Sequence, residues 1–507
     1  MNLLNFFANY EISWRNANKI LIFIIFLINI LCYYIFPNTD LFNFTTLIIN
    51  SLFCIILLAS LSINNYSLLI LGSVISTISY IFIFPRVFIN LVLPGEIPLP
   101  WGQEIDVINF NYAYFYIVIS VTFILIGVYA SSLLIKNFTK KEIYLTSSTQ
   151  KKTGHDIFLT TCIFFTIALI INLVFKYSIF NFEEETRNNR ILGITSVLFS
   201  ASLAANCGIF YLKETMSSFR HYYIGLIIIL YLLVCILLGS RSGPITLFYM
   251  LITTKLILER DFKLSIKKYL LCGISFLVIS LISFEIGTNI RNNIMRDNPI
   301  YAQAQKIEAL EKIEALQKIE EEKKNKLNIY FNEGAKILLT RLFFPFDLSI
   351  LSLILDQDDE HHKKFMNMQY MLKSGVNIIV PGVIFEDAKL NTALLWPFLY
   401  KFRDMEILND SYYYESFAWG IWSIFHVMYG RYLGLFLIFI LGIMWGLLFN
   451  KIASMKNKEV LTSYFVYISF PIFFMAGIDD YLSWSAQIFI SLIVYILIKK
   501  YINLFIK

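Results

Sequence analysis

Arginines placed among or beside apolar stretches are the residues of this sequence whose setting points most clearly to chemistry. Arg241 stands in LLGSRSGPIT, between two apolar runs and without a charged partner near it in the chain. Arg291 ends an apolar run, Arg341 lies inside one, and Arg190 follows the short polar stretch after another. A guanidinium in such a setting is costly unless it faces a water-filled cavity or a ligand. Its planar fork also binds phosphate through paired hydrogen bonds, so these arginines predict a phosphate-binding site.

Simpler roles remain open for two of these arginines and for one acidic stretch. Arg190 lies near Glu183–Glu185 and can pair with them, while Arg291 can extend to the membrane surface as an anchor. The stretch DQDDEHH at 356–362 holds residue types that bind metals. Two adjacent histidines cannot both point into one site from a regular helix, and the spacing does not match a calcium loop. We expect a solvated turn there and no metal.

Candidate acids and bases lie in a segment rich in aromatic residues, NDSYYYESFAWGIWSIFHVMYGRYLG at 409–434. Glu415 is the first candidate for a general base, because burial among aromatic rings would raise the pKa of a carboxyl toward a working value. His426 is the second candidate, and Glu386 or Asp387 the third. The aromatic rings of this segment fit the faces of sugars, although aromatic belts at membrane surfaces have the same composition.

The elements that must position these residues are membrane helices. The chain has 507 residues, of which 57% are hydrophobic and 15% charged, and its mean hydropathy is +0.65. This composition is not that of a soluble globular protein. About twelve stretches reach the ~17–25 apolar residues that a spanning helix needs. We predict an all-α integral membrane protein with spans at 19–36, 41–62, 67–84, 111–135, 157–180, 191–212, 222–239, 243–258, 269–289, 432–450, 459–477 and 482–498.

Lysines and arginines in the short loops predict the orientation. They gather in the loops around 136–152, 213–220, 260–268 and 451–458 and at 499–500. With twelve spans, all of these loops lie on the same side as both termini, which the positive-inside rule makes cytoplasmic. All six cysteines fall within predicted spans, so we expect no disulfide-bonded outer domain. The net charge of +6 reflects these loops, and no nucleic-acid partner is expected.

The predicted organisation therefore has three parts. Residues 1–289 hold the first nine spans, residues 290–430 form a large extracytoplasmic loop, and residues 431–507 hold the last three spans. The cytoplasmic loops are short and contain no phosphate-binding loop motif. Within the large loop, the charged region 300–328 contains Glu–Lys pairs four residues apart, which favour a helix. We interpret this helix as a solvated spacer, with a partner-binding arm as the alternative.

A chain with these features resembles the oligosaccharide repeat unit polymerases, the Wzy type of O-antigen polymerase. The resemblance rests on the GSRSG turn around Arg241, on Arg291 at the end of the following outward span, and on the R-L-x-x-P stretch at Arg341. The large loop and the late segment SYYYESFAWG add to it, and the likeness covers roughly residues 150–490. The charged helix at 300–328 is not part of the family pattern, so it looks like an insertion.

The resemblance implies a bacterial inner-membrane glycosyltransferase with a fold similar to the GT-C type, acting in O-antigen, lipopolysaccharide or capsule synthesis. Both substrates would be undecaprenyl-diphosphate-linked oligosaccharides. Membrane lipids would surround the enzyme, and a chain-length regulator protein would be a partner. No metal or other cofactor is implied. In this interpretation the diphosphates would be bound by arginines, and the acceptor hydroxyl would be activated by Glu415 or His426. The arginines are Arg241, Arg291, Arg341 and Arg190.

Two alternatives remain. An O-antigen ligase shares the arginines and the large outer loop, so the sequence separates it poorly from a polymerase. A flippase for lipid-linked oligosaccharides is a transporter of similar span count. Such a transporter needs access from both faces and is expected to contain an internal repeat. The spans of this sequence show no such repeat, and a large loop on one side has no evident use in a flippase.

Overall fold

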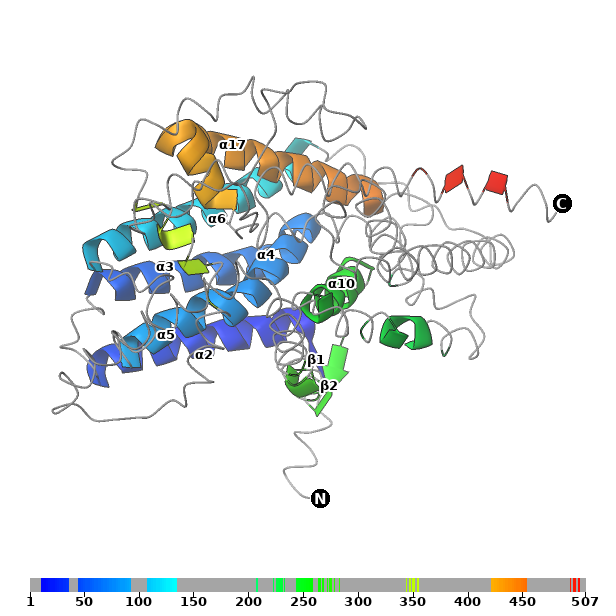
Figure 1. Ribbon diagram of the computed structural model, residues 1–507, viewed down its shortest axis with the longest axis horizontal. Coiled ribbons are helices and arrows are strands. Elements are labelled where there is room, and N and C mark those ends of the chain that lie inside the picture. The colour runs from blue at the N-terminus through cyan, green and yellow to red at the C-terminus, as the bar shows by residue number, and fades with distance from the viewer. Residues whose placement is uncertain are drawn as a thin grey trace, which may run out of the picture.

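The computed structural model describes residues 11–35, 44–92, 107–134, 243–258, 263–265 and 421–453. It also describes single positions and short runs within 207–282, 343–354 and 493–501. Helices dominate these parts of the chain (Figure 1), as the sequence predicts. Four of them are long and apolar enough to cross a membrane, and they comprise Trp14–Ile35, Phe44–Ser62, Ile108–Leu134 and Gly430–Lys451.

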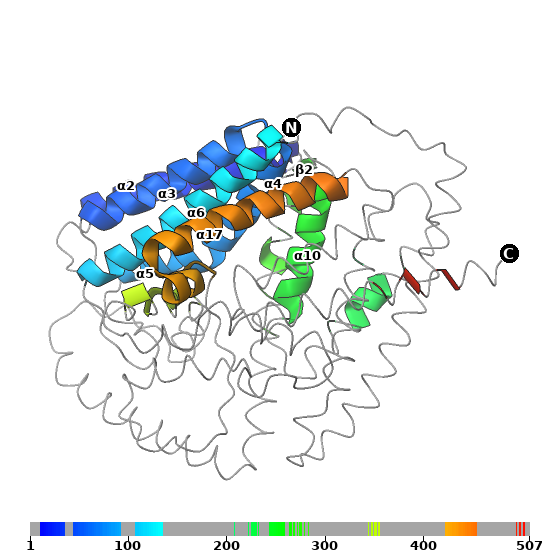
Figure 2. The same cartoon turned by 90° about the horizontal axis from the view of Figure 1, so that it is seen from above.

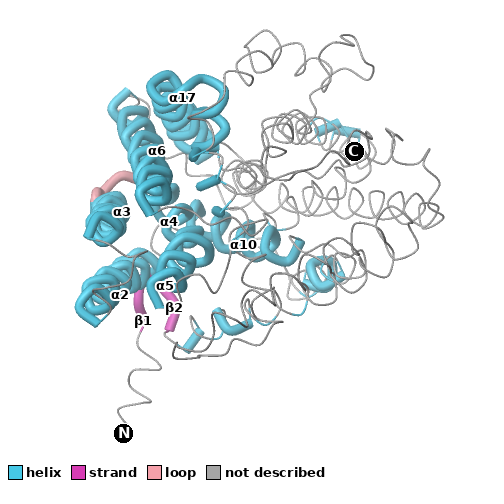
Figure 3. The backbone as a smooth tube through the Cα atoms, turned by 60° about the vertical axis from the view of Figure 1, so that its left-hand side comes forward, coloured by secondary structure: helices cyan, strands magenta, loops and turns pink. Residues whose placement is uncertain are grey.

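The long helices α2 (Trp14–Ile35), α3 (Phe44–Ser62), α6 (Val107–Leu134) and α17 (Ile421–Ala453) lie side by side. Figure 3 shows them in a curved row, with α4 and α5 against its inner side. The outer surface of the row is apolar: on α2, for example, Leu31 exposes 57% of its surface. Large exposed apolar side chains on a long helix suit lipid as the surrounding solvent. The prediction of a membrane protein is therefore supported, while the count of twelve spans stays a prediction.

The third predicted span is an interrupted helix in the structure. It comprises α4 (Tyr66–Ile78), the wider turn η1 (Ser79–Ile83) and α5 (Phe84–Val92). The amide of Phe84 donates to the carbonyl of Ser79, five residues back, where a regular helix bonds four back. Pro85 follows and has no amide hydrogen to donate. After the interruption, α5 continues the helix to Val92, eight residues beyond the predicted end of the span.

Close packing of α6 against α17 depends on small residues. A Cβ atom placed on Gly127 would meet the backbone of α17 at Phe439, and one on Gly442 would meet the backbone of α6 at Ile124. Gly446 likewise lies against Ser131. Small residues four apart let two membrane helices approach until their backbones touch. Because higher residue numbers on α6 meet higher numbers on α17, the two helices run parallel, as Figure 1 also shows.

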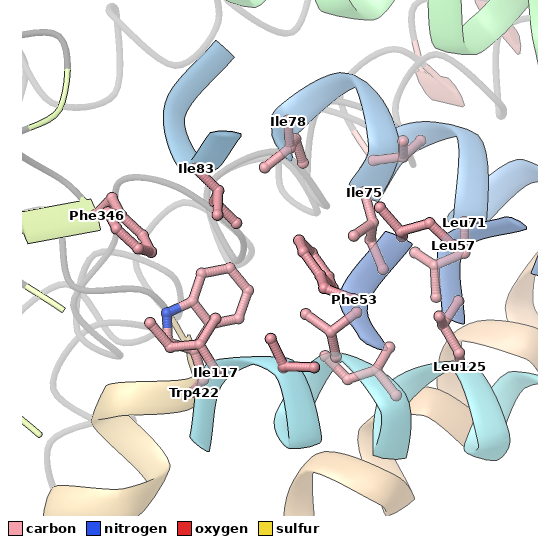
Figure 4. Close-up of a cluster of buried hydrophobic side chains, with 14 of the residues drawn as sticks. Phe53, Leu57, Leu71, Ile75, Ile78, Ile83, Ile117, Leu125, Phe346 and Trp422 are labelled. Carbon is pink, nitrogen blue, oxygen red and sulfur yellow. The ribbon is translucent and has the colours of Figure 1, made fainter. Parts of the chain in front are cut away.

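The hydrophobic core of the described region lies between α3, α4 and α6. Figure 4 shows Phe53 and Leu57 of α3 facing Leu71 and Ile75 of α4, with Leu125 of α6 nearby. Phe53, Leu57 and Ile117 are fully buried. These side chains are packed on several sides, which distinguishes them from the lipid-facing residues of α2.

At one end of the bundle, which we call the Arg15 end, polar contacts join the ends of the helices. Strand β1 (Glu11–Ser13) pairs antiparallel with β2 (Lys263–Ser265), the only strand pair in the described residues. Arg15 donates to the carbonyl oxygens of Leu61 (2.6 Å) and Ser62 (2.7 Å), at the end of α3. Asn65 accepts from the amide of Leu68 as the N-cap of α4, and donates to Ser132 of α6 over 2.6 Å. The Arg15 end is defined by these contacts of β1, β2, Arg15, Asn65 and Ser132.

Helix α10 (Gly243–Leu258) has the bounds predicted for the eighth span. Pro244 lies in its first turn, where a missing amide hydrogen costs nothing. With 16 residues it is shorter than the four helices that are long enough to cross a membrane. It contacts α4 (Figure 2 shows its place beside the bundle). Two predicted spans, 157–180 and 459–477, lie outside the described residues, and 191–212 is described only at Cys207, which is helical and buried. The spans 222–239, 269–289 and 482–498 are described only at scattered helical positions.

Candidate functional site

The opposite end of the bundle, which we call the Asp347 end, gathers charged and aromatic side chains. It comprises Arg86 of α5, Asp347, Tyr112 and Tyr116 of α6, and His426 and Arg431 of α17. The first contact there is a buried ion pair. The Nε of Arg86 donates to Oδ1 of Asp347 over 2.8 Å, and the two side chains expose 2% and 0% of their surfaces. The pair seats the helical residues between 343 and 354, which belong to the predicted large loop, on α5.

The surroundings of this pair are apolar. The ring centre of Phe343 lies 5.9 Å from the guanidinium carbon of Arg86, and Phe346 packs against Tyr114 with ring centres 6.1 Å apart. The second carboxylate oxygen of Asp347 is buried and contacts no donor among the described residues. Asp347 belongs to none of the helices long enough to cross a membrane. Burial raises the pKa of its carboxyl to about 6, although the neighbouring Arg86 acts in the opposite direction.

His426 lies one helical turn beyond Trp422 on the first segment of α17, and both side chains are buried. Its imidazole packs edge-on against the ring of Tyr116, with ring centres 4.5 Å apart and ring planes at 67°. Figure 4 shows Trp422 beside Ile117 of α6, with Phe346 and Ile83 nearby. Histidine is the most common general acid or base in enzymes, so His426 remains a candidate for that role.

A sharp bend in α17 brings His426 to this place. Gly430 has φ 74° and ψ 175°, a conformation that residues with a Cβ atom rarely adopt. Beyond the bend, the helix passes close to its own first segment: a Cβ atom on Gly434 would lie 2.7 Å from the carbonyl oxygen of Phe425. The two glycines therefore fold residues 421–429 back over the start of the long apolar stretch.

Arg431 directly follows the bend and is exposed. Its guanidinium carbon lies 5.2 Å from the ring centre of Tyr112, while its carbonyl oxygen accepts from the hydroxyl of Tyr116 over 3.3 Å. Tyr112 and Tyr116 are one turn apart on α6, so one face of α6 holds both Arg431 and His426. A guanidinium and an imidazole on one helix face can bind an anion and transfer a proton, which are the two tasks of a group transfer from a phosphate.

Below this surface, a network of buried polar side chains joins α2, α3 and α6. Tyr114 donates to Asn50 over 2.6 Å, and Asn50 donates to Asn29 over 3.1 Å. Thr46 donates to Asn111 over 2.5 Å. Hydrogen bonds between membrane helices hold them in one register, because lipid offers no alternative partner. The network fixes Tyr114, against which Phe346 packs.

Of the site residues predicted from the sequence, only His426 lies in the described part of the chain. Its burial and its tyrosine contact are consistent with the predicted role, which they do not test. The other predicted site residues lie outside the described residues: Glu415, Glu386, Asp387, Arg190, Arg241, Arg291 and Arg341. The described residues contain no cluster of ligands that could hold a metal ion.

Sequence reasoning missed the pairing of Arg86 with Asp347 and the roles of Tyr112 and Tyr116. A signal for the pair was present. Arg86 is a basic residue on the side that the loop charges make outward, and Asp347 is the acidic residue of an otherwise apolar run. Charges in apolar segments are costly unless they are paired, although Arg341 lies in the same run and is nearer to Asp347 in the sequence than Arg86 is. The tyrosines gave no comparable signal, because aromatic residues are common throughout this chain.

Comparison with known proteins identifies no relative: no protein-family model, no curated protein and no solved structure matches this chain.

Proposed function

We propose that the protein is a membrane glycosyltransferase that joins oligosaccharide repeat units carried on undecaprenyl diphosphate, as a polysaccharide polymerase of the bacterial inner membrane. The observation that carries this proposal is that the two described parts of the segment 290–430 pack on the same end of the bundle. Asp347 anchors the helical positions between 343 and 354 on α5, and His426 belongs to the helical turns at 421–429, near the end of the segment. That both described parts of the segment lie at one end suits an enzyme that works at a single membrane surface.

Contacts at the Arg15 end support the proposed orientation. Strand β2 contains Lys263, and Lys267 and Lys268 follow it closely in the chain. A loop rich in lysine next to a span belongs to the cytoplasmic side. The pairing of β1 with β2 puts the start of α2 on that same side. The Asp347 end then faces outward, where lipid-linked repeat units are joined in this proposal.

The chemistry required is a displacement at the anomeric carbon of the growing chain. The bond from that carbon to the diphosphate oxygen breaks, and a bond to an acceptor hydroxyl oxygen forms as the hydroxyl loses its proton. Fixed cations stabilise the charge that develops on the diphosphate, a role proposed for Arg241, Arg291, Arg341 and Arg190. Glu415, or His426 as the second choice, takes the proton.

Reconstitution tests the proposed activity. The purified full-length protein in liposomes is supplied with the undecaprenyl-diphosphate-linked repeat unit from its own cells, and the products are separated on a gel. We expect a ladder of two and more repeats together with free undecaprenyl diphosphate. Repeat units that stay single would refute the polymerase. Transfer of glycan only to an added lipid-core acceptor would indicate a ligase, and transbilayer movement without a new bond would indicate a transporter.

Substitutions then test the residue roles. Glu415→Gln is nearly isosteric and removes only the capacity to take a proton, so we expect single-repeat product at a normal protein level. Arg241→Lys keeps the charge but loses the planar fork, and severe loss of the ladder is expected. His426→Gln serves as the comparison for Glu415→Gln. A normal ladder with Glu415→Gln and none with His426→Gln would move the base to His426.

A further inference from the structure

The three described arginines differ in how their hydrogen-bonding groups are used. Arg15 is committed to the carbonyl oxygens of Leu61 and Ser62, and Arg86 to the carboxylate of Asp347. Arg431 makes neither kind of contact with any residue in the described part of the chain. Its guanidinium lies over the ring of Tyr112, and the face of that aromatic ring attracts the cation. The guanidinium N–H groups of Arg431 make no hydrogen bond to a described residue, so they are available to an acceptor beside the ring.

The position of Arg431 along α17 sets the depth of this guanidinium. Arg431 and Lys451 stand at the two ends of the apolar stretch Gly430–Lys451. Twenty helical residues span ~30 Å, the thickness of the hydrocarbon core. Both cations therefore lie at the level of lipid phosphates, on opposite surfaces. Tyr432, next to Arg431, exposes 83% of its surface, as expected for an aromatic residue at the membrane surface.

We propose that Arg431, held over Tyr112, binds the phosphate group of a lipid at the Asp347 end. Resting on the proposed function, we assign this phosphate to the diphosphate of the lipid-linked substrate. The bonding is that of a planar guanidinium fork with phosphate oxygens. His426 lies on the same face of α6 through its contact with Tyr116, so a diphosphate at Arg431 would have an imidazole nearby. A phosphate on a bilayer lipid has the same chemistry, and the experiment separates the two sources.

Binding without turnover provides the test. The full-length protein in detergent is titrated separately with undecaprenyl diphosphate and with phosphatidylglycerol, and bound lipid is counted by mass spectrometry of the intact complex. We expect Arg431→Gln to weaken undecaprenyl diphosphate binding about tenfold or more, as for a charge-assisted hydrogen bond. Arg431→Lys should bind undecaprenyl diphosphate with an affinity between those of the wild type and Arg431→Gln, since lysine keeps the charge but lacks the planar guanidinium fork. Tyr112→Phe should bind normally, whereas Tyr112→Leu should bind several-fold more weakly because the ring face is lost.

Lys451→Gln, at the other end of the same apolar stretch, is the matched control and should leave binding of undecaprenyl diphosphate unchanged. Equal binding by the wild type and Arg431→Gln would overturn the site. Equal weakening of both lipids would keep the phosphate site but overturn the substrate assignment. Normal binding of undecaprenyl diphosphate with no polymer in the reconstituted assay would refute the proposed polymerase and leave this site standing. Thermal unfolding of each variant confirms that the fold is retained.

Discussion

The two ends of the described bundle are joined by different kinds of contact. At the Arg15 end, side chains mainly satisfy the backbone: Arg15 bonds two carbonyl oxygens at the end of α3, and Asn65 caps the start of α4 while also donating to the side chain of Ser132. At the Asp347 end, side chains bond one another. A buried ion pair, an imidazole against a phenol ring and a guanidinium over another ring meet there.

This difference suggests that the contacts at the Arg15 end only complete the helix ends, whereas those at the Asp347 end have a further role. Every helix has unpaired carbonyl and amide groups at its ends, and the contacts at the Arg15 end satisfy such groups. A buried ion pair is a poor way to join helices, because the desolvation of two charges cancels most of their attraction. Helices of this length could meet through apolar contacts alone. The charges at the Asp347 end therefore point to a role beyond packing, and three substitutions measure the contrast.

The largest effect is expected at the buried pair. Asp347→Leu leaves the guanidinium of Arg86 buried without its carboxylate, which costs about 3–5 kcal/mol of the free energy of unfolding. Steric trapping in lipid bicelles measures this free energy. The double variant Arg86→Met with Asp347→Leu removes both charges and should recover most of the loss. If the double variant is stable and still makes a normal ladder, the pair serves packing only, and the contrast between the two ends fails.

A smaller effect is expected at the bend of α17. Gly430→Ala places a Cβ atom at φ 74°, and the cost is about 1–3 kcal/mol from the backbone alone, since open space surrounds the position. Gly225 also has open space around it but no positive φ, so Gly225→Ala is the control and should be neutral or slightly stabilising. Thermal unfolding in detergent compares the two variants. Equal melting temperatures would show that the bend is not strained.

The smallest effect is expected at the Arg15 end. Asn65→Ala removes the cap of α4 and the bond to Ser132, at a cost of about 1 kcal/mol. Asn65→Ser retains a capping oxygen, and should recover part of that loss. Because this end only closes the helices, polymer length should be normal in both variants. A shortened ladder at normal protein level would extend the functional region to this end.

The sequence predicted the described helices well, for a simple physical reason. Spanning helices need long apolar runs, and such runs at 19–36, 41–62, 111–135 and 432–450 correspond to α2, α3, α6 and α17. The apolar pattern could not predict the π turn before Pro85 or the first segment of α17 up to Gly430. Both depend on local backbone geometry, which leaves little trace in hydropathy.

The site was less accessible to sequence reasoning, because its residues meet only through the fold. Arg86 and Asp347 lie 261 positions apart. The residues adjacent to each in the sequence do not indicate which residue is its partner. His426 was predicted from its aromatic surroundings, yet its contact with Tyr116 depends on the bend at Gly430. Arg431 had the same surroundings as His426. Only its place over Tyr112, and the absence of an acceptor among the described residues, distinguish it from an ordinary interfacial arginine.

The parallel pairing of α6 and α17 restricts the number of membrane crossings that the chain between them can make. Both helices pass through the membrane in the same direction, as their contacts from Tyr116–Arg431 to Ser131–Gly446 show. A chain that leaves α6 on one side must return to the other before it enters α17. If α6 and α17 both span the bilayer as predicted, an odd number of crossings is expected between Leu134 and Gly430.

The sequence predicts five crossings in that stretch, which satisfies the rule. The shortest of them is α10, with 16 residues. If α10 did not cross, four crossings would remain, and α17 would have to enter from the wrong side. With five predicted crossings, the parallel direction of α6 and α17 predicts that α10 also spans the membrane, and reporter fusions near residues 241 and 261 should report opposite sides.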